Sequence, residues 1–280
     1  MKYGVNLWLW QDAFRVDENL FSQIKRMGFD GVEIPLNDPD TFNVHEIKKA
    51  LNNCGLEMLF TGVFGSSRDL ISDDTILRKN AFDYIRKSIE IVSSSGTDVF
   101  SGPMYSSVGK LIGRGRTQKE WERCINQLKE LGKISSDNGI TLAIEILNRF
   151  EVYFLNTAED AKKLLDEVNS LAVKVHIDSF HMHIEEKNIY SAVHSLGDYV
   201  YHVHCSENDR GIPGSGQVDW GGFFKALKNI GYDRWLVIES FVPGVKEIAK
   251  AASIWRDIAP DSDTLAQKGL SFIKAKFAVS

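Results

Sequence analysis

The sequence is short of cysteine, of long apolar runs and of positive charge, and each shortage excludes a class of protein. Its three cysteines, Cys54, Cys124 and Cys205, are odd in number and far apart. A disulfide framework is therefore not expected, and a reduced cytoplasmic protein is. No apolar run approaches the roughly 18 residues that a bilayer-spanning helix needs. Residues 1–14 also lack the apolar stretch and small-residue cleavage site of a signal peptide.

The charge balance argues against nucleic acid and membranes as partners. Lys and Arg number 33 against 38 Asp and Glu, which leaves a net charge of −5 at pH 7. An acidic chain has no general attraction for phosphate-rich surfaces. Nucleic acid or an anionic membrane would therefore need a local basic patch to bind. Hydrophobic residues make up 43% and charged residues 25% of the chain, which is typical of globular proteins rather than collagen-like or disordered ones.

The sequence does contain one rhythm repeated eight times, a short apolar run followed by an amphipathic segment. The apolar runs are typical of buried strands and begin at or next to Tyr3, Gly31, Leu56, Thr97, Thr141, Val173, Tyr201 and Arg234. Apolar residues three and four apart, as at Leu20, Ile24 and Met27, predict the covering helices. Helix ends are predicted by glycines at Gly28, Gly55, Gly96, Gly139 and Gly231, and helix starts by Thr117 and Thr157.

This rhythm predicts an α/β fold, a single (β/α)8 barrel domain over residues 1–280 with residues 261–280 as an appended C-terminal helix. An open doubly wound sheet is the alternative. Such a sheet usually carries a Gly-rich phosphate-binding turn after its first strand, whereas the segment WLWQDAF at this point contains no glycine. The barrel is therefore favoured.

Four metal-competent side chains stand near the ends of the last four predicted strands: Glu145, Asp178, His204 and Glu239. In such barrels the functional residues lie at the C-terminal ends of the strands. A single acidic residue there could be a helix cap or an ion-pair partner, but four in succession favour a shared site. Three buried carboxylates would repel one another unless a divalent cation joined them. Oxygen-rich ligands with one imidazole suit Mn²⁺ or Mg²⁺, with Co²⁺ also possible.

The segments IEILNRFEVYFLNT, HIDSFHMHIEE, HVHCSENDRGIPGSGQVDW and VIESF resemble the ketose 3-epimerases. This group includes the D-tagatose, D-allulose (psicose) and L-ribulose 3-epimerases, within the xylose isomerase-like TIM barrels. The resemblance implies an isomerase with one divalent metal ion per subunit, held by the same four residues. It also implies that Glu151, His181 and Arg210 hold the O1–O2–O3 end of a monosaccharide. Members are commonly dimers or tetramers, so a homodimer or homotetramer is expected.

The proton transfers of such a reaction are assigned to Glu145 and Glu239. Inversion at C3 of a ketose needs a proton removed from one face and returned to the other, because the neighbouring carbonyl can take the charge as an enediolate. The two glutamates end strands that are three apart around an eight-stranded ring. They are therefore expected to flank the substrate as catalytic residues as well as metal ligands.

Several other functions are compatible with these motifs. Relatives with similar motifs invert C4 of 3-keto-glycosides, and an aldose–ketose isomerase would use the same scaffold. A metal-dependent hydrolase or nuclease similar to endonuclease IV would need more His and Asp ligands and a basic face. A sugar-binding protein without catalysis would have little use for four buried ionisable ligands.

Four other polar residues are expected near the proposed site. His176 and His202 lie two positions before Asp178 and His204, so they are expected one layer lower and behind the metal ligands. Glu33 is expected at the end of the second strand, as a wall of the pocket or a buried pair. Asn6 replaces an aromatic residue found in several ketose 3-epimerases and is expected near the far end of the sugar.

Overall fold

The computed structural model describes residues 1–62 and 64–280. Eight parallel strands close into a barrel in the order β1 to β8, with β1 paired to β8. The strands are β1 Lys2–Asn6, β2 Gly31–Leu36, β3 Glu57–Gly62, β4 Val99–Gly102, β5 Thr141–Glu145, β6 Val173–Asp178, β7 Val200–Cys205 and β8 Trp235–Ile238. All eight predicted strands are therefore confirmed, and so is the closed barrel. Val63, inside the third predicted apolar run, lies outside the described residues.

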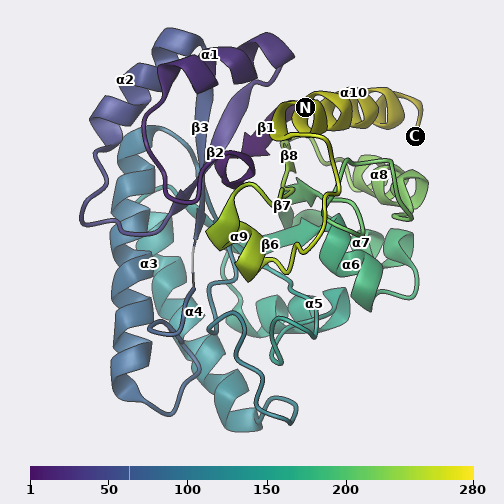
Figure 1. Ribbon diagram of the computed structural model, residues 1–280. Coiled ribbons are helices and arrows are strands. Elements are labelled where there is room, and N and C mark those ends of the chain that lie inside the picture. Colours follow the sequence, from purple (N-terminus) through teal and green to yellow (C-terminus); the bar gives the residue numbers. More distant parts are fainter. Residues whose placement is uncertain (63) are drawn as a thin grey trace.

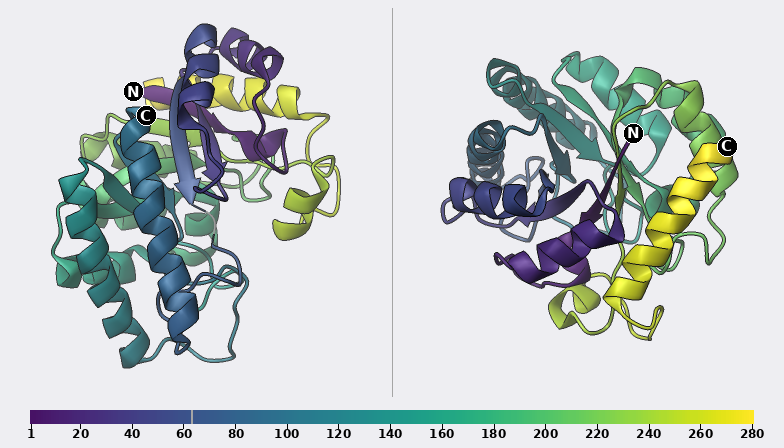
Figure 2. Two further views of the ribbon diagram at one scale, coloured as in Figure 1. Left: turned by 90° about the vertical axis from the view of Figure 1, so that its left-hand side faces the viewer. Right: turned by 90° about the horizontal axis from the view of Figure 1, so that it is seen from above.

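Helices surround the strands on the outside of the barrel (Figures 1 and 2). They are α1 Glu18–Met27, α2 Val44–Cys54, α3 Thr75–Ser95, α4 Gln118–Asp137, α5 Ala158–Val168, α6 Ser179–Glu185, α7 Ile189–Leu196, α8 Trp220–Asn229, α9 Lys246–Ala251 and α10 Ser262–Val279, with short 3-10 turns η1 Leu7–Leu9 and η2 Gly197–Tyr199. In the described part of the chain, no helix is both long and apolar enough to cross a membrane.

Residues predicted to begin and end helices lie at helix ends in the structure. Thr117 caps α4 with a reciprocal capping box that includes Glu120, and the Thr157 side chain accepts from the third backbone N–H of α5. Gly28, Gly55 and Gly96 follow α1, α2 and α3 with φ of 98°, 70° and 90°. A left-handed residue that stops a helix is most easily a glycine, because it has no Cβ to clash.

The C-terminal helix α10 takes the eighth place in the outer ring, because only the short α9 follows β8 directly. It packs between α8 and α1 (Figure 1). Lys274 Nζ donates to the carbonyl oxygen of Gly28 at 2.9 Å, and Trp10 Nε1 donates to Asp263 Oδ1 at 2.9 Å. The predicted terminal helix over residues 261–280 is thus confirmed, with α10 as part of the barrel wall.

The inside of the barrel changes from apolar to polar along its axis. Leu59, Val99, Ala143 and Val237 form a buried cluster. Side chains of a strand alternate between faces, so the residues two positions later on the same strands point inward one layer higher. On β5 and β8 these higher residues are Glu145 and Glu239. The lower end of the barrel is therefore a packed core, and ionisable groups gather at the C-terminal end.

Candidate metal and substrate site

The four predicted metal ligands come together at the C-terminal end of the barrel. One donor atom of each of Glu145, Asp178, His204 and Glu239 lies within 4.8 Å of those of the others. All four side chains are buried, and the largest exposed fraction among them is 6%. They come from four successive strands, β5 to β8, whose parallel alignment brings their ends to one place. The set therefore has the buried, convergent arrangement that a cation site needs.

The orientation of His204 fits a cation. Its Nε2 lies 2.8 Å from Glu33 Oε2, so this nitrogen carries the hydrogen. Its Nδ1 lies 3.4 Å from Glu239 Oε2, is buried, and has no hydrogen-bond partner among the described residues. Burial alone would lower the pKa of His204, but Glu33 and Glu239 outweigh it and raise the pKa well above its usual value. The surroundings of Nδ1 thus demand a positive charge, which a proton or a metal ion can supply.

The three carboxylates are only partly neutralised by the chain itself. Arg210 Nη1 donates to Asp178 Oδ2 at 2.6 Å and to Glu239 Oε2 at 3.0 Å. Burial raises the pKa of Glu145 well above its usual range, and the neighbouring Glu239 raises it further. Burial also raises the pKa of Asp178, against the lowering effect of Arg210. One guanidinium leaves negative charge uncompensated, and a divalent cation would balance it.

His181 and Arg210 present two hydrogen-bond donors to one place. The backbone N–H of Asn148 donates to His181 Nδ1 at 3.1 Å, so the ring hydrogen must be on Nε2. Burial and the nearby Arg210 lower the pKa of His181, which keeps the ring neutral. Arg210 Nη2 lies 3.1 Å from Nε2, so two donors face each other without an acceptor. An oxygen atom of a ligand that accepts from both would complete this arrangement.

Glu151 contributes an acceptor beside these donors. Asn148 Nδ2 donates to Glu151 Oε1 at 2.9 Å, and this oxygen lies 4.0 Å from His181 Nδ1. Burial raises the pKa of Glu151, against the lowering effect of Arg210. The three residues implied by the resemblance to bind substrate therefore lie together. Glu151 and Arg210 are on the loops that follow β5 and β7, and His181 is in the short helix α6 that follows β6.

A cavity of about 460 Å³ opens above these groups. Its polar floor includes Glu145, Glu151, His181, Arg210 and Glu239, and its walls include Trp8, Phe64, Val108, Phe241 and Ala252. A volume of this order is typical of sites for small molecules. Convergent polar groups on one side and apolar side chains on the other suit a sugar, which has hydroxyl edges and apolar C–H faces.

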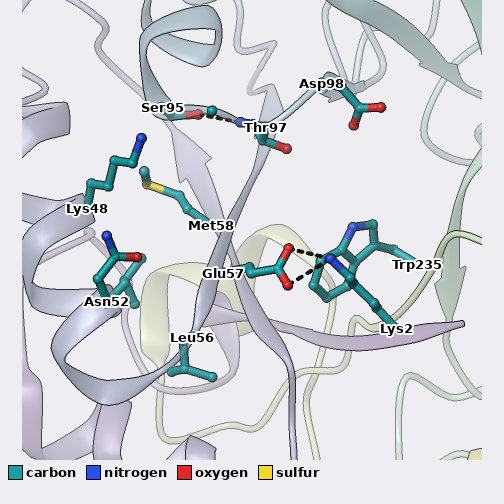
Figure 3. A pocket seen from close by; sticks show the side chains of 12 residues that line it. Lys2, Lys48, Asn52, Leu56, Glu57, Met58, Ser95, Thr97, Asp98 and Trp235 are labelled. Atoms are coloured by element: carbon teal, nitrogen blue, oxygen red, sulfur yellow. Dashed lines mark hydrogen bonds and ion pairs between the residues drawn. The ribbon is translucent and has the colours of Figure 1, made fainter.

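A second cavity, of about 380 Å³, lies at the opposite end of the barrel (Figure 3). It is bordered by the first residues of β1, β3 and β8, where Lys2 Nζ pairs with Glu57 at 2.7 Å next to Trp235. In barrels of this class that end supports stability, and the loops at the other end carry function. The chemistry is therefore expected at the cavity above the four buried ligands.

The structure corrects the places of two residues. Glu33 is in the middle of β2 rather than at its end. It is fully buried and accepts from His202 Nε2 at 2.7 Å, so of its two expected roles the buried pair is confirmed and the pocket wall is not. Asn6, expected near the far end of the sugar, is 1% exposed, donates to Glu33 Oε2 at 2.8 Å and does not line the cavity. The β-strand continues past Glu33 because Ile34, Pro35 and Leu36 still pair with β3. His176 and His202 are buried, as expected.

Sequence reasoning missed two supporting residues, Glu207 and Asn148. Glu207 is fully buried and accepts from the backbone N–H groups of Gly214 at 2.7 Å and Val218 at 3.0 Å. The segment GIPGSGQ, residues 211–217, is a glycine-rich loop of the kind that can bind phosphate through backbone amides. Here it closes around the Glu207 carboxylate, so these amides are not free for a phosphate. An acidic residue four positions before this glycine-rich stretch was the signal that could have indicated Glu207. Asn148 could not be found this way, because its role depends on His181, 33 positions away.

A family model for the xylose isomerase-like TIM barrel matches residues 21–276. The chain is 33% identical to a probable ketose 3-epimerase of Synechocystis sp., over 99% of this chain and 97% of that one. It is 31% identical to a ketose 3-epimerase of Arthrobacter globiformis, over 99% and 96%. The crystal structure of D-allulose 3-epimerase from Methylomonas sp. in complex with D-allulose superposes with a TM-score of 0.93 at 29% identity, covering 99% of this chain and 97% of that one. D-Psicose 3-epimerase with D-tagatose from Clostridium cellulolyticum H10 gives 0.92 at 28% identity, with 99% of both chains covered.

Proposed function

The chain belongs to the ketose 3-epimerases of the xylose isomerase-like TIM-barrel family, which are isomerases, and we propose that it inverts C3 of a free ketose with the help of one divalent metal ion. Candidate substrates are D-tagatose, D-fructose, D-allulose and L-ribulose. The observation that carries this proposal is the buried set of Glu145, Asp178, His204 and Glu239, in which His204 Nδ1 has no partner among the described residues.

These four side chains would hold the ion, with Mn²⁺ favoured and Co²⁺ or Mg²⁺ possible. A divalent cation held by them would supply positive charge that stabilises the negative charge developed on the substrate when C3 loses its proton. Arg210 contributes a second positive charge from the loop after β7, through Nη1 and Nη2. A phosphate group on the substrate would add negative charge to a site already rich in carboxylates, so free sugars are the favoured class.

Glu145 and Glu239 are proposed to move the proton. The hydrogen on C3 is weakly acidic because the carbonyl at C2 can take the charge. One glutamate removes it, and the other returns a proton to the opposite face. Their strands, β5 and β8, are three apart around the barrel, and on this ground the two carboxyl groups are proposed to act from opposite sides of the substrate. Both line that cavity.

His181, Arg210 and Glu151 are proposed to hold the O1–O2–O3 end of the substrate. His181 Nε2–H and Arg210 Nη2 are donors 3.1 Å apart, and an oxygen of the ketose would accept from both. Glu151 would accept from a hydroxyl group. Trp8 and Phe241, whose ring centroids are 6.5 Å apart, would face the apolar side of the sugar.

The test is epimerisation in D₂O by wild type and by Glu145→Gln and Glu239→Gln, with Glu57→Gln at the far end of the barrel as the matched control. Wild type and the control should place deuterium at C3 of the product, and the two site variants should not form product. Product without solvent deuterium would overturn the two-glutamate scheme. An aldose product, or turnover of only a 3-keto-glycoside or abasic DNA in a parallel Mn²⁺ panel, would overturn the proposed reaction.

A further inference from the structure

Glu33 lies at the centre of the barrel, directly below the proposed metal ligands. It is fully buried. Its Oε1 lies 2.7 Å from His202 Nε2, and its Oε2 lies 2.8 Å from both His204 Nε2 and Asn6 Nδ2. Ser101 Oγ is a weaker contact at 3.4 Å from Oε1. One carboxylate thus joins β1, β2, β4 and β7 inside the barrel.

The contact with His204 decides which ring nitrogen faces the other ligands. A carboxylate can only accept, so Glu33 keeps a hydrogen on His204 Nε2. In a metal-bound histidine the other nitrogen must then be free of hydrogen, and this is Nδ1, which points toward Glu239. Without Glu33, nothing among the described contacts of Nε2 would favour this tautomer over the one with hydrogen on Nδ1. The second tautomer cannot bind a metal through Nδ1.

We propose that Glu33 is the positioning residue of the metal centre, which fixes the tautomer and the ring orientation of His204. This inference rests on the proposed metal site. Glu33 does not line the cavity, and among the described residues its one hydrogen bond to a proposed metal ligand is the one to His204. Removal of a hydrogen-bond partner behind a metal-bound histidine typically costs about 10–100-fold in metal affinity.

The variant Glu33→Gln tests this role with little change in side-chain volume. Gln has one oxygen and one NH₂ group, so it places a donor against His202 or against His204 and Asn6, which are themselves donors. Even in the orientation that keeps the bond to His204, the charge that strengthened it is lost. Ser101→Ala is the matched control, because it removes a hydroxyl group from the same buried cluster and leaves the contact with His204 intact.

Titration of Mn²⁺ into metal-free protein measures the effect directly. We expect the Kd to rise about 10–100-fold in Glu33→Gln and to stay within about twofold of wild type in Ser101→Ala. An unchanged Kd in Glu33→Gln, with only a lower melting temperature, would mean that Glu33 merely stabilises the core and would overturn the inference. Failure of wild type to bind Mn²⁺ would instead refute the proposed function.

A spectroscopic measurement on the wild-type protein covers the case in which Glu33→Gln does not fold. In the Mg²⁺-loaded enzyme with ¹⁵N-labelled histidine, His204 should show hydrogen on Nε2 and none on Nδ1. Its signals can be assigned by their loss in His204→Gln. Hydrogen on Nδ1 with Nε2 free would contradict the proposed role of Glu33.

Discussion

Replacing Glu207 with Gln should destabilise the loop that carries Arg210. Glu207 Oε1 accepts from the backbone N–H groups of Asn208 and Val218, at 3.1 and 3.0 Å. Its Oε2 accepts from Gly214 N at 2.7 Å and from Trp220 Nε1 at 3.0 Å. Each oxygen serves two donors, so a Gln in either orientation turns its NH₂ group toward two donors and leaves them without an acceptor.

The size of the effect follows from these contacts. A buried donor without an acceptor costs about 1–3 kcal/mol, so two of them should lower the free energy of unfolding by about 2–6 kcal/mol. At roughly 2–4 °C per kcal/mol for a large single domain, the melting temperature should fall by about 4–24 °C. Activity should fall as well, because Arg210 N is bonded to Glu207 O at 2.9 Å and Arg210 has a left-handed φ of 63°. This strained conformation needs an ordered loop.

Calorimetry of Glu207→Gln beside Glu57→Gln checks this prediction. Glu57 pairs with Lys2 on the surface, where loss of an ion pair costs at most about 1 kcal/mol.

The stabilising effect of Glu207 should also depend on pH. Burial alone would raise the pKa of Glu207, but its four hydrogen bonds outweigh burial and lower it. Its stabilising contribution is therefore complete above the ordinary pKa of a glutamate and is lost as the pH falls through the lower pKa of the folded state. The difference in melting temperature between wild type and Glu207→Gln should therefore become smaller as the pH falls from the ordinary pKa of a glutamate through the lower pKa of Glu207 in the folded state. Equal melting temperatures for the two variants at neutral pH would refute the reasoning.

Three further predictions concern the site. Chelation should abolish activity and lower the melting temperature, with Mn²⁺ or Co²⁺ restoring both, because a bound ion stabilises the folded state; full activity in protein shown by elemental analysis to be metal-free would contradict this. Arg210→Lys should lower kcat/KM at least about tenfold in a steady-state assay, because one ammonium group cannot both contact Asp178 and Glu239, as Nη1 does, and present a second donor beside His181 Nε2, as Nη2 does; unchanged kinetics would show that Arg210 is not needed in the site. D-Fructose should be turned over with a higher kcat/KM than D-fructose 6-phosphate, and the reverse order would show that the site tolerates the extra negative charge.

Much of the architecture could be predicted from the sequence, because the signals are local. A strand with both faces buried is a short apolar run in the sequence, and a helix has apolar residues spaced three and four apart. Both signals are independent of the rest of the fold. A parallel barrel brings all its strand ends to one side. The meeting of Glu145, Asp178, His204 and Glu239 therefore follows from their position at four successive strand ends.

Only the tertiary structure decided how these side chains are held. His204 is bonded to Glu33, 171 residues away, and His181 to the backbone of Asn148, 33 residues away. The sequence placed Glu33 at a strand end, as a pocket wall or a buried pair, and Asn6 near the sugar, whereas Glu33 lies within its strand and pairs with Asn6 below the pocket. Strand periodicity tells which face a side chain takes, but the stagger between strands sets which residues meet across the barrel. The hydrogen-bond partners that choose a histidine tautomer depend on that stagger, and so they have no local signal in the sequence.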